Sequence, residues 1–319
     1  MSDIFTLLNL VPRNRLGDWI NSLVEWLTHH WSGFFGGIAN GINQSVAWIQ
    51  DLLQSLPIVA VVIVLAVIAL LARGLLAAVL SAAGLLLIDS FDQWSNAMDT
   101  LALVVFASVV AVLVSIPLGI IAAKSRTVSV VTKPAMDFMQ TLPSFVYLLP
   151  AMFFFSIGAT TAIVATIVFA IPPGVRLAEL GIRQVDPEMV EAGQAFGARS
   201  GTVLRGIQIP LAMPTIMAGV NQVIMLSLSM TVIAGLVGAG GLGGAVVEAL
   251  QTLDIKLSVD SGVSVVILAI YLDRITAGLA GGHRSFLTRL REDVGRRLRP
   301  THDTAQPDPA SEETAHAAA

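Results

Sequence analysis

Long apolar runs separated by short polar segments make up most of the chain. Seven runs are candidates for helices that cross a bilayer, and they occupy residues 57–72, 75–89, 99–122, 141–157, 159–175, 213–237 and 261–282. Only Arg73 and Gly74 separate the first two runs, which favours a tight helical hairpin; one long kinked segment, and hence six spans, is the alternative. The pattern therefore predicts an all-α membrane protein with about seven transmembrane helices.

The N-terminal region, residues 1–56, has a different pattern. Apolar residues such as Leu16, Trp19, Leu23 and Leu27 recur every three or four positions, which predicts amphipathic helices that lie on the membrane. Four of the five tryptophans belong to this region, and Trp is enriched at membrane–water interfaces. Packing at the surface is the simpler role for these helices, and regulation or sensing is the alternative.

Lysine and arginine residues lie mainly in alternate loops. They occur at Arg73, around 124–133, through 176–212 and after residue 283, whereas the loop 238–260 has Lys256 as its one cation. Because positive residues beside spans are retained in the cytoplasm, this alternation predicts an N-terminus outside the cell and a cytoplasmic C-terminus. Six spans would break the alternation.

Composition limits the chemistry available to the chain. Hydrophobic residues make up 55% of the sequence and charged residues 13%, as expected of a chain that lies mostly in lipid. There is no cysteine and the five histidines are scattered, so we expect no thiol nucleophile, disulfide or metal site. No G-x-x-x-x-G-K-[ST] sequence is present, so we expect no ATP-phosphate loop, no enzyme activity of the chain itself and no catalytic residue. We also expect no nucleic-acid partner.

The last segment, 283–319, is basic at first and then small, polar and proline-containing. We expect a cytoplasmic basic segment up to Arg299 and, because the residues after it have too little apolar content to bury a core, a disordered tail beyond it.

The largest positive loop, 176–212, has an ordered pattern. Pro187 fits the first turn of a helix, Asp186 before it fits the capping position, and Gly197 fits the end of that helix. A second amphipathic segment then leads to Pro210. We expect a short helix–turn–helix on the cytoplasmic surface.

This loop resembles the signature of ABC importer permeases, which reads Glu-Ala-Ala, three residues, Gly, nine residues, Ile, any residue, Leu-Pro. The chain has the same spacings in Glu191, Ala192, Gly193, Gly197, Ile207, Ile209 and Pro210. The departures are Gly193 for alanine and Ile209 for leucine. The resemblance implies a MetI-like membrane fold and a coupling helix near residues 188–200 that docks onto a separate ATPase subunit. ATP and Mg²⁺ would bind that subunit, and this chain would bind no cofactor.

Four further segments are similar to permeases for glycine betaine, proline and related quaternary amines. They are MDFMQTLPSFVYLLP (136–150), FAIPPGVRLAELGIRQV (169–185), LAMPTIMAGVNQVIMLSLSMTVIAGLVGAGGLG (211–243) and ILAIYLDRIT (267–276). The resemblance covers nearly all of a predicted transmembrane permease domain, 57–282. It implies ATP-driven import of a compatible solute across a bacterial inner membrane, with an extracytoplasmic substrate-binding protein and a second permease copy in a homodimer. The alternatives are an ABC permease for another small solute, an ion-coupled secondary carrier and a membrane scaffold without transport.

Aromatic and polar residues inside the predicted spans are candidates for the translocation pathway. Phe145 and Tyr147 have ring faces suited to stacking on a methylammonium cation, although ordinary packing is the simpler role. Hydrogen bonding between helices and lining of the pathway are both open for Asn221, Gln222 and Ser229.

Asp273 and Arg274 are opposite charges within one predicted span, where charge is unfavourable unless it is paired or faces protein. Neighbouring residues point about 100° apart on a helix, so we expect an ion pair across helices near the cytoplasmic end, with gating as the alternative. Gly238, Gly240 and Gly243 match the spacing G-x-G-x-x-G, but they follow a membrane helix. We therefore expect a tight turn or a close helix contact there rather than a phosphate site.

Overall fold

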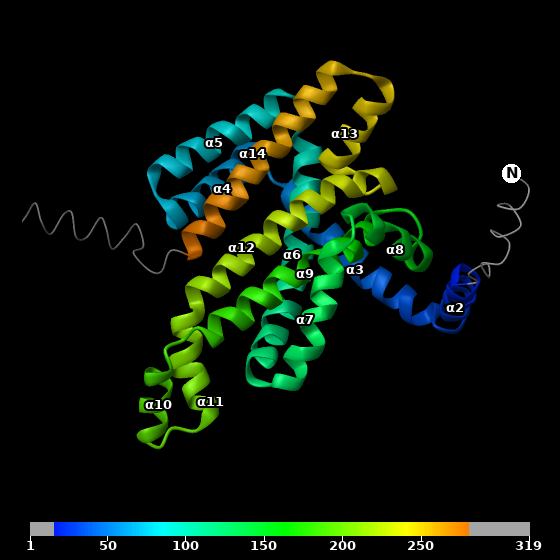
Figure 1. Cartoon of the computed structure of the whole chain (residues 1–319). Coiled ribbons are helices and arrows are strands. Elements are labelled where there is room, and N and C mark those ends of the chain that lie inside the picture. The colour runs from blue at the N-terminus through cyan, green and yellow to red at the C-terminus, as the bar shows by residue number, and fades with distance from the viewer. Residues whose placement is uncertain (1–15, 281–319) are drawn as a thin grey trace, which may run out of the picture. The chain divides into compact units, whose positions relative to one another are not determined.

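The structure is a computed structural model that describes residues 16–280, and every element in this range is a helix. The predicted basic segment and tail (283–319), the first fifteen residues of the N-terminal region and the end of the last predicted span lie outside the described residues. The helices are, in order, α2 (Leu16–His30), α3 (Ser32–Ser55), α4 (Ile58–Arg73), α5 (Leu75–Ser90), α6 (Trp94–Lys124), α7 (Arg126–Thr141), η1 (Ser144–Tyr147), α8 (Leu148–Phe155), α9 (Ala159–Arg183), α10 (Pro187–Ala195), α11 (Ser200–Val203), the π-turn η2 (Leu204–Gln208), α12 (Ile209–Ile233), η3 (Ala234–Val237), α13 (Gly241–Thr252) and α14 (Ile255–Ala280) (Figure 1).

Four helical stretches are long and apolar enough to cross a membrane: α6, α9, the continuous run Ser200–Val237 and Ile255–Gly278 of α14. Two bent pairs meet the same criterion when each is taken as one span. They are α3 with α4, bent by 109°, and α7 with η1 and α8, bent by 110°. The apolar helix α5 has 16 residues and is shorter. These elements contain the predicted runs as far as the structure describes them, and 57–72 and 75–89 form the predicted hairpin as α4 and α5.

Helices α6 and α9 run in the same direction. Leu103 of α6 shares a core cluster with Ile163 of α9, and two turns further along both helices Ala111 shares a cluster with Ala170. Gly119 then lies so close to α9 that a Cβ atom there would be 2.6 Å from the Ala178 Cβ. Because α6 and α9 are parallel, the intervening segment α7–η1–α8 returns the chain to the level at which α6 began.

The remaining helix directions follow from similar contacts. Gly174 lies against Val223 and Gly181 lies against Thr215, so α12 runs opposite to α9. Helix α14 runs parallel to α4, because the Tyr271 hydroxyl donates to the Leu65 carbonyl at 3.1 Å and Gly278 packs on Ala72. Helix α5 packs beside both α4 and α14 (Figure 1).

The predicted span 141–157 is not a straight helix. Helix α7 ends at Thr141, Pro143 follows in an extended conformation, and only the short helices η1 and α8 cover the rest of the run. Proline disfavours a helical conformation for the residue before it and lacks an amide donor, which explains the break. The Tyr147 hydroxyl donates to the Met139 carbonyl across the bend.

The predicted loop 176–212 is shorter in the structure than in the sequence-based expectation. Helix α9 continues to Arg183, and α12 is already helical at Ile209. The charged residues that suggest the beginning of a loop are located on the side of α9 that faces α7. There Arg176 contacts Asp137, and the Glu179 carboxylate accepts a hydrogen bond from the Ser129 hydroxyl. Paired charges allow the helix to continue beyond its apolar part.

Helix α3 packs against the bundle rather than lying on a membrane surface alone. Its Val46 is 2% exposed and shares a core cluster with Leu103 and Ile163. Near the start of α9, the Thr160 hydroxyl donates to Asn43 of α3 at 2.7 Å. Near the start of α6, Asp99 accepts from the Gln54 amide of α3 at 2.7 Å. Helix α3 therefore connects the beginnings of α9 and α6.

Candidate functional site

The loop between α9 and α12 contains the short helix α10, whose start follows from its sequence. Pro187 occupies the first helical turn, where its missing amide hydrogen has no intrahelical partner to lose. The Asp186 carboxylate before it accepts a hydrogen bond from the Glu188 amide at 2.9 Å. The predicted cap is therefore formed, and it orients α10 immediately after the end of α9.

Gly197 ends α10 in a Schellman turn. Its φ is +80°, a conformation that glycine adopts without strain. The Gly197 amide donates to the Gln194 carbonyl at 2.8 Å, and the Ala198 amide donates to the Gly193 carbonyl at 3.1 Å. The chain reverses here, as the sequence predicts, and enters α11.

The reversal brings Gly193 of α10 against Ile207 of the π-turn. A Cβ atom at Gly193 would lie 2.6 Å from the Ile207 Cδ1 and 3.5 Å from a Val203 methyl group. The two signature positions thus form the contact that closes the helix–turn–helix. Pro210, the last residue of the signature, lies in the first turn of α12 directly after the π-turn.

Helix α10 is also joined to the bundle by an apolar cluster. Ile182 in the last turn of α9 and Val185 just after this helix pack with Val190 of α10 and Leu204 of η2. The same cluster contains residues of α6 and α12, namely Ile116, Ile120, Ala123, Ala212 and Ile216. Helix α10 therefore packs, through this cluster, against the ends of α6, α9 and α12.

The opposite side of this helix–turn–helix carries exposed side chains. The Phe196 side chain is 94% exposed and Met189 is 50% exposed, although both are large and apolar. Glu191 and Ala192 are exposed on the same short helix. Figure 1 shows α10 and α11 at one end of α9 and α12, far from α13.

The two aromatic pathway candidates lie in η1, at the bend of the broken pair. Phe145 is exposed. Tyr147 is half-buried, and its ring packs edge-on against Phe169 of α9 with centroids 5.6 Å apart. Tyr147 thus packs against α9. No aromatic ring within the described residues stacks against the ring of Phe145.

The three polar candidates of α12 have different surroundings. Gln222 and Ser229 are exposed, and the Ser229 hydroxyl donates to the Met225 carbonyl of its own helix at 3.1 Å. Asn221 points toward α14, where its amide donates to Asp273 at 3.3 Å and its carbonyl accepts from Thr276. Asn221 therefore connects α12 to α14, whereas Gln222 and Ser229 face away from the bundle.

The charges Asp273 and Arg274 separate as helix geometry requires. Asp273 faces α12, while Arg274 is exposed. Within residues 16–280, the partner of Asp273 is the Asn221 amide, and the ion pair expected across helices is not among the salt bridges. An amide that donates to the carboxylate supplies part of the stabilisation that a cation would give.

A buried carboxylate, Glu179, was not selected from the sequence. It is 5% exposed in the last turns of α9, where it accepts hydrogen bonds from Ser129 of α7 at 2.7 Å and from Arg183 at 2.8 Å. The Lys133 ammonium of α7 is 3.7 Å from the same carboxylate oxygen. A signal was present in the three- and four-residue spacing of Arg176, Glu179 and Arg183, which places them on one helix face.

The glycine run after η3 forms a tight turn and close helix contacts. Gly238, Gly240 and Gly241 all have positive φ. A Cβ atom at Gly235 would overlap the backbone of Gly243, and the Leu242 amide donates to the Thr100 hydroxyl at 2.8 Å. The expected turn is thus present, and it brings the start of α13 against α6.

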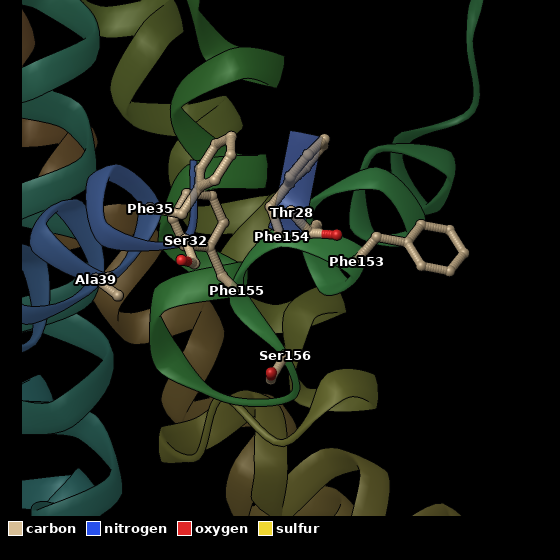
Figure 2. A pocket seen from close by; sticks show the side chains of 9 residues that line it. Thr28, Ser32, Phe35, Ala39, Phe153, Phe154, Phe155 and Ser156 are labelled. Atoms are coloured by element: carbon tan, nitrogen blue, oxygen red, sulfur yellow. The ribbon is translucent and has the colours of Figure 1, made fainter. Parts of the chain in front are cut away.

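A small cavity of about 240 Å³ lies where the N-terminal helices meet α8. Figure 2 shows Phe35 of α3 beside Phe154 and Phe155, while Phe153 points away. The rings of Phe35 and Phe154 are stacked with centroids 4.7 Å apart. These contacts fasten α3 to the end of the broken pair.

Comparison with known proteins identifies the family. Residues 115–279 match the family described as "Binding-protein-dependent transport system inner membrane component". The chain is 43% identical over 274 residues to the glycine betaine transport system permease protein OpuAB of Bacillus subtilis, covering 85% of this chain and 96% of the relative. It is 42% identical over 276 residues to the glycine betaine/proline betaine transport system permease protein ProW of Escherichia coli, covering 86% of this chain and 77% of the relative.

A solved structure agrees with these sequence relatives. An inward-facing structure of the MetNI methionine ABC transporter has a TM-score of 0.54 over 59% of this chain and 94% of that chain, at 21% sequence identity. This likeness confirms the MetI-like fold that the loop signature implies. The chain therefore belongs to the family of inner membrane components of binding-protein-dependent transport systems, the ABC importer permeases.

Proposed function

We propose that this chain is the membrane-spanning subunit of an ATP-driven importer for glycine betaine, proline betaine or a related quaternary amine. The observation that carries the proposal is the geometry of α10, a short helix held rigidly at both ends that exposes apolar side chains beyond the membrane bundle. The relatives named as glycine betaine permeases, which match across most of this chain, support the substrate class.

The exposed surface of α10 supports docking of a partner ATPase. Phe196 is almost fully exposed and stands beside the Gly197 turn, with Met189 exposed nearby. An exposed apolar patch with a polar rim is typical of a protein contact, and Phe196 and Met189 would supply the apolar part of such a patch. ATP and Mg²⁺ would bind the partner, and this chain would contribute the docking surface and the transmission of movement.

The cluster beneath α10 supports transmission. Val190 and Leu204 pack on Ile182 and Val185, and through them on the ends of α6, α9 and α12. Closely packed interiors move as units rather than deforming continuously. Displacement of α10 by a closing ATPase would therefore tilt these three helices.

One face of α12 supports a pathway shared with a second permease copy. A stripe of exposed residues at intervals of four or seven positions runs along this helix; its members are Leu211, Ala218, Gln222 and Ser229. Polar side chains are unfavourable against lipid and usually face protein or water in membrane proteins. Gln222 and Ser229 would line the pathway between two copies, with Phe145 as a candidate for stacking on the quaternary amine.

The helix directions support seven crossings, with α7–η1–α8 as one broken crossing. The positive residues Arg73, Lys124 and Arg183 lie at the ends of α4, α6 and α9, which run toward the same side. This side would be the cytoplasm. The N-terminus would then lie outside, and α13 would face an extracytoplasmic substrate-binding protein.

Reconstitution into liposomes tests the proposal. The chain, its ATPase and its binding protein are incorporated together, and uptake of radiolabelled glycine betaine is measured with ATP inside the vesicles. We expect uptake to require ATP and the binding protein and to persist when ion gradients are collapsed. Uptake driven by a sodium or proton gradient without ATP would instead establish a secondary carrier.

A further inference from the structure

Among residues 16–280, Glu179 of α9 is the one carboxylate that is buried, and no role in transport follows for it from the loop signature. Its side chain is 6% exposed, and it is surrounded by two cationic groups and one hydroxyl group, those of Lys133, Arg183 and Ser129. A carboxylate is excluded from water at a large cost unless hydrogen bonds and opposite charges stabilise it. Its surroundings are thus a built polar network rather than an exposed surface pair.

This network joins three helices: the Glu179 carboxylate connects α9 to α7, and Arg183 connects α9 to α6. Oε1 of Glu179 accepts from the Ser129 hydroxyl of α7 at 2.7 Å and from Arg183 of α9 at 2.8 Å. Arg183 also donates to the Ala122 carbonyl near the end of α6 at 2.9 Å. The Lys133 ammonium of α7 approaches the same Glu179 oxygen to 3.7 Å.

The network lies between the coupling loop and the broken crossing. Ile182 and Val185, one to two turns beyond Glu179, pack against Val190 of α10. Helix α7 leads in the other direction to the bend and η1, which holds Phe145 and Tyr147. Arg176 and Asp137 make a second contact between α9 and α7 on the side nearer that bend.

We propose that Glu179 is a positioning residue that makes α7 move together with α9 when α10 is displaced, so that the movement reaches η1 and α8. The inference rests on the proposed import function. It adds a second route to the apolar cluster beneath α10, which reaches α6, α9 and α12 but contains no residue of α7. Without Glu179, the broken crossing would follow the coupling loop less closely.

The first test is Glu179→Gln in the complex of permease, ATPase and binding protein. Glutamine has nearly the same shape and still accepts from Ser129, but it loses the charge that attracts Arg183 and Lys133. We expect unchanged basal ATP hydrolysis, and a decrease of about twofold to thirtyfold in glycine betaine-stimulated hydrolysis and uptake, the range that coupling residues span. Glu25→Gln is the matched control, because Glu25 is exposed in α2, and it should leave both activities unchanged.

A reversible cross-link separates positioning from a merely structural role. The chain has no native cysteine, so Asp137→Cys and Arg176→Cys can be joined by a short bifunctional methanethiosulfonate reagent, which restores a connection between α7 and α9. In the Glu179→Gln background, we expect the cross-link to restore stimulated hydrolysis and reductant to abolish it again. The same cross-link is also made in the double-cysteine protein that keeps Glu179. Loss of stimulated hydrolysis there would overturn the proposal, because α7 and α9 would then have to separate during transport.

The outcomes distinguish this inference from the function on which it rests. If the wild-type complex shows no glycine betaine-stimulated hydrolysis, the proposed function fails. If the wild-type is stimulated and Glu179→Gln is stimulated equally, only the role of Glu179 fails. Should Glu179→Gln reduce assembly, Ser129→Ala removes one hydrogen bond while keeping the carboxylate and Arg183; normal coupling in that variant would count against the proposal, and a partial loss would support it.

Discussion

Gly193 of α10 lies directly beneath Ile207 of the π-turn, so that a Cβ atom on the glycine would be 2.6 Å from the isoleucine Cδ1. These two residues belong to one signature in the sequence, and the structure makes them a contact. The Cδ1 atom is the far end of a flexible side chain, which can move by a rotamer change. The contact therefore explains how the permease signature can have alanine where this chain has glycine.

Replacement of Gly193 should depend on side-chain size. We expect Gly193→Ala to keep most uptake because Ile207 can rotate away, and Gly193→Leu to lose uptake because overpacking of about 1–3 kcal/mol separates α10 from η2. Uptake and membrane abundance measured together check this expectation. Ile207→Val should improve Gly193→Ala; normal uptake in Gly193→Leu would show that the contact is unnecessary.

Gly197→Asp should uncouple transport without preventing assembly. A side chain at a positive φ costs about 1–2 kcal/mol, and the new charge would stand beside the exposed Phe196, while no atom lies within 4 Å of the added Cβ. We expect near-normal membrane levels, with loss of uptake and of substrate-stimulated ATP hydrolysis. Gly201→Asp is the control, since Gly201 is also exposed and uncrowded but lies in α11 without a positive φ.

Gly235→Ala should prevent stable folding, whereas Gly244→Ala should be tolerated. A Cβ atom at Gly235 would overlap backbone atoms of Gly243, which cannot rotate aside, while Gly244 has no neighbour within 4 Å. We expect the first variant to be retained poorly in the membrane and to unfold at a lower temperature in detergent. Equal thermal stability of the two variants would mean that η3 and α13 do not pack as closely as this.

The stabilisation from the contact between Asn221 and Asp273 should come from the hydrogen bond and not from the charge of Asp273. Asp273→Asn keeps an oxygen that accepts from the Asn221 amide, so we expect little change in the free energy of unfolding. Asp273→Leu removes the acceptor and should lower that free energy by about 1 kcal/mol, a usual value for hydrogen bonds between membrane helices. Thermal unfolding of the purified variants measures the difference, and a large loss in Asp273→Asn would indicate that the charge itself is required.

Single cysteines should test the crossings, because the native chain has none. Ser95, at the start of α6, and Ser200, at the start of α11, are both exposed, and Thr127 is an exposed probe beside the half-buried cap Ser125. We expect Ser95→Cys to react with an impermeant maleimide from outside intact cells, and Thr127→Cys and Ser200→Cys to react only after permeabilisation. Labelling of Ser95→Cys and Ser200→Cys from the same side would refute the orientation.

Local signals in the sequence determined where many helices begin and end. The apolar runs indicated membrane helices, and Asp186, Pro187 and Gly197 indicated both ends of α10, because capping bonds and positive φ involve residues only a few positions apart. The loop signature, which also consists of residues close together in the sequence, indicated the family. A charge that is paired by another helix carries no such local signal, so Arg176 suggests a loop although α9 continues to Arg183.

The tertiary structure decided which helix faces meet. The parallel packing of α6 and α9, and hence the broken return through α7 and α8, depends on close contacts such as Gly119 with Ala178 between residues far apart in the chain. The same is true of Glu179 with Ser129 and of Asn221 with Asp273. In lipid, an apolar side chain gains little by meeting another apolar helix, so the partner of each face is selected by small residues and rare polar groups on both helices together. A pattern along one segment specifies that the segment is a helix, but it does not specify the second surface that completes the contact.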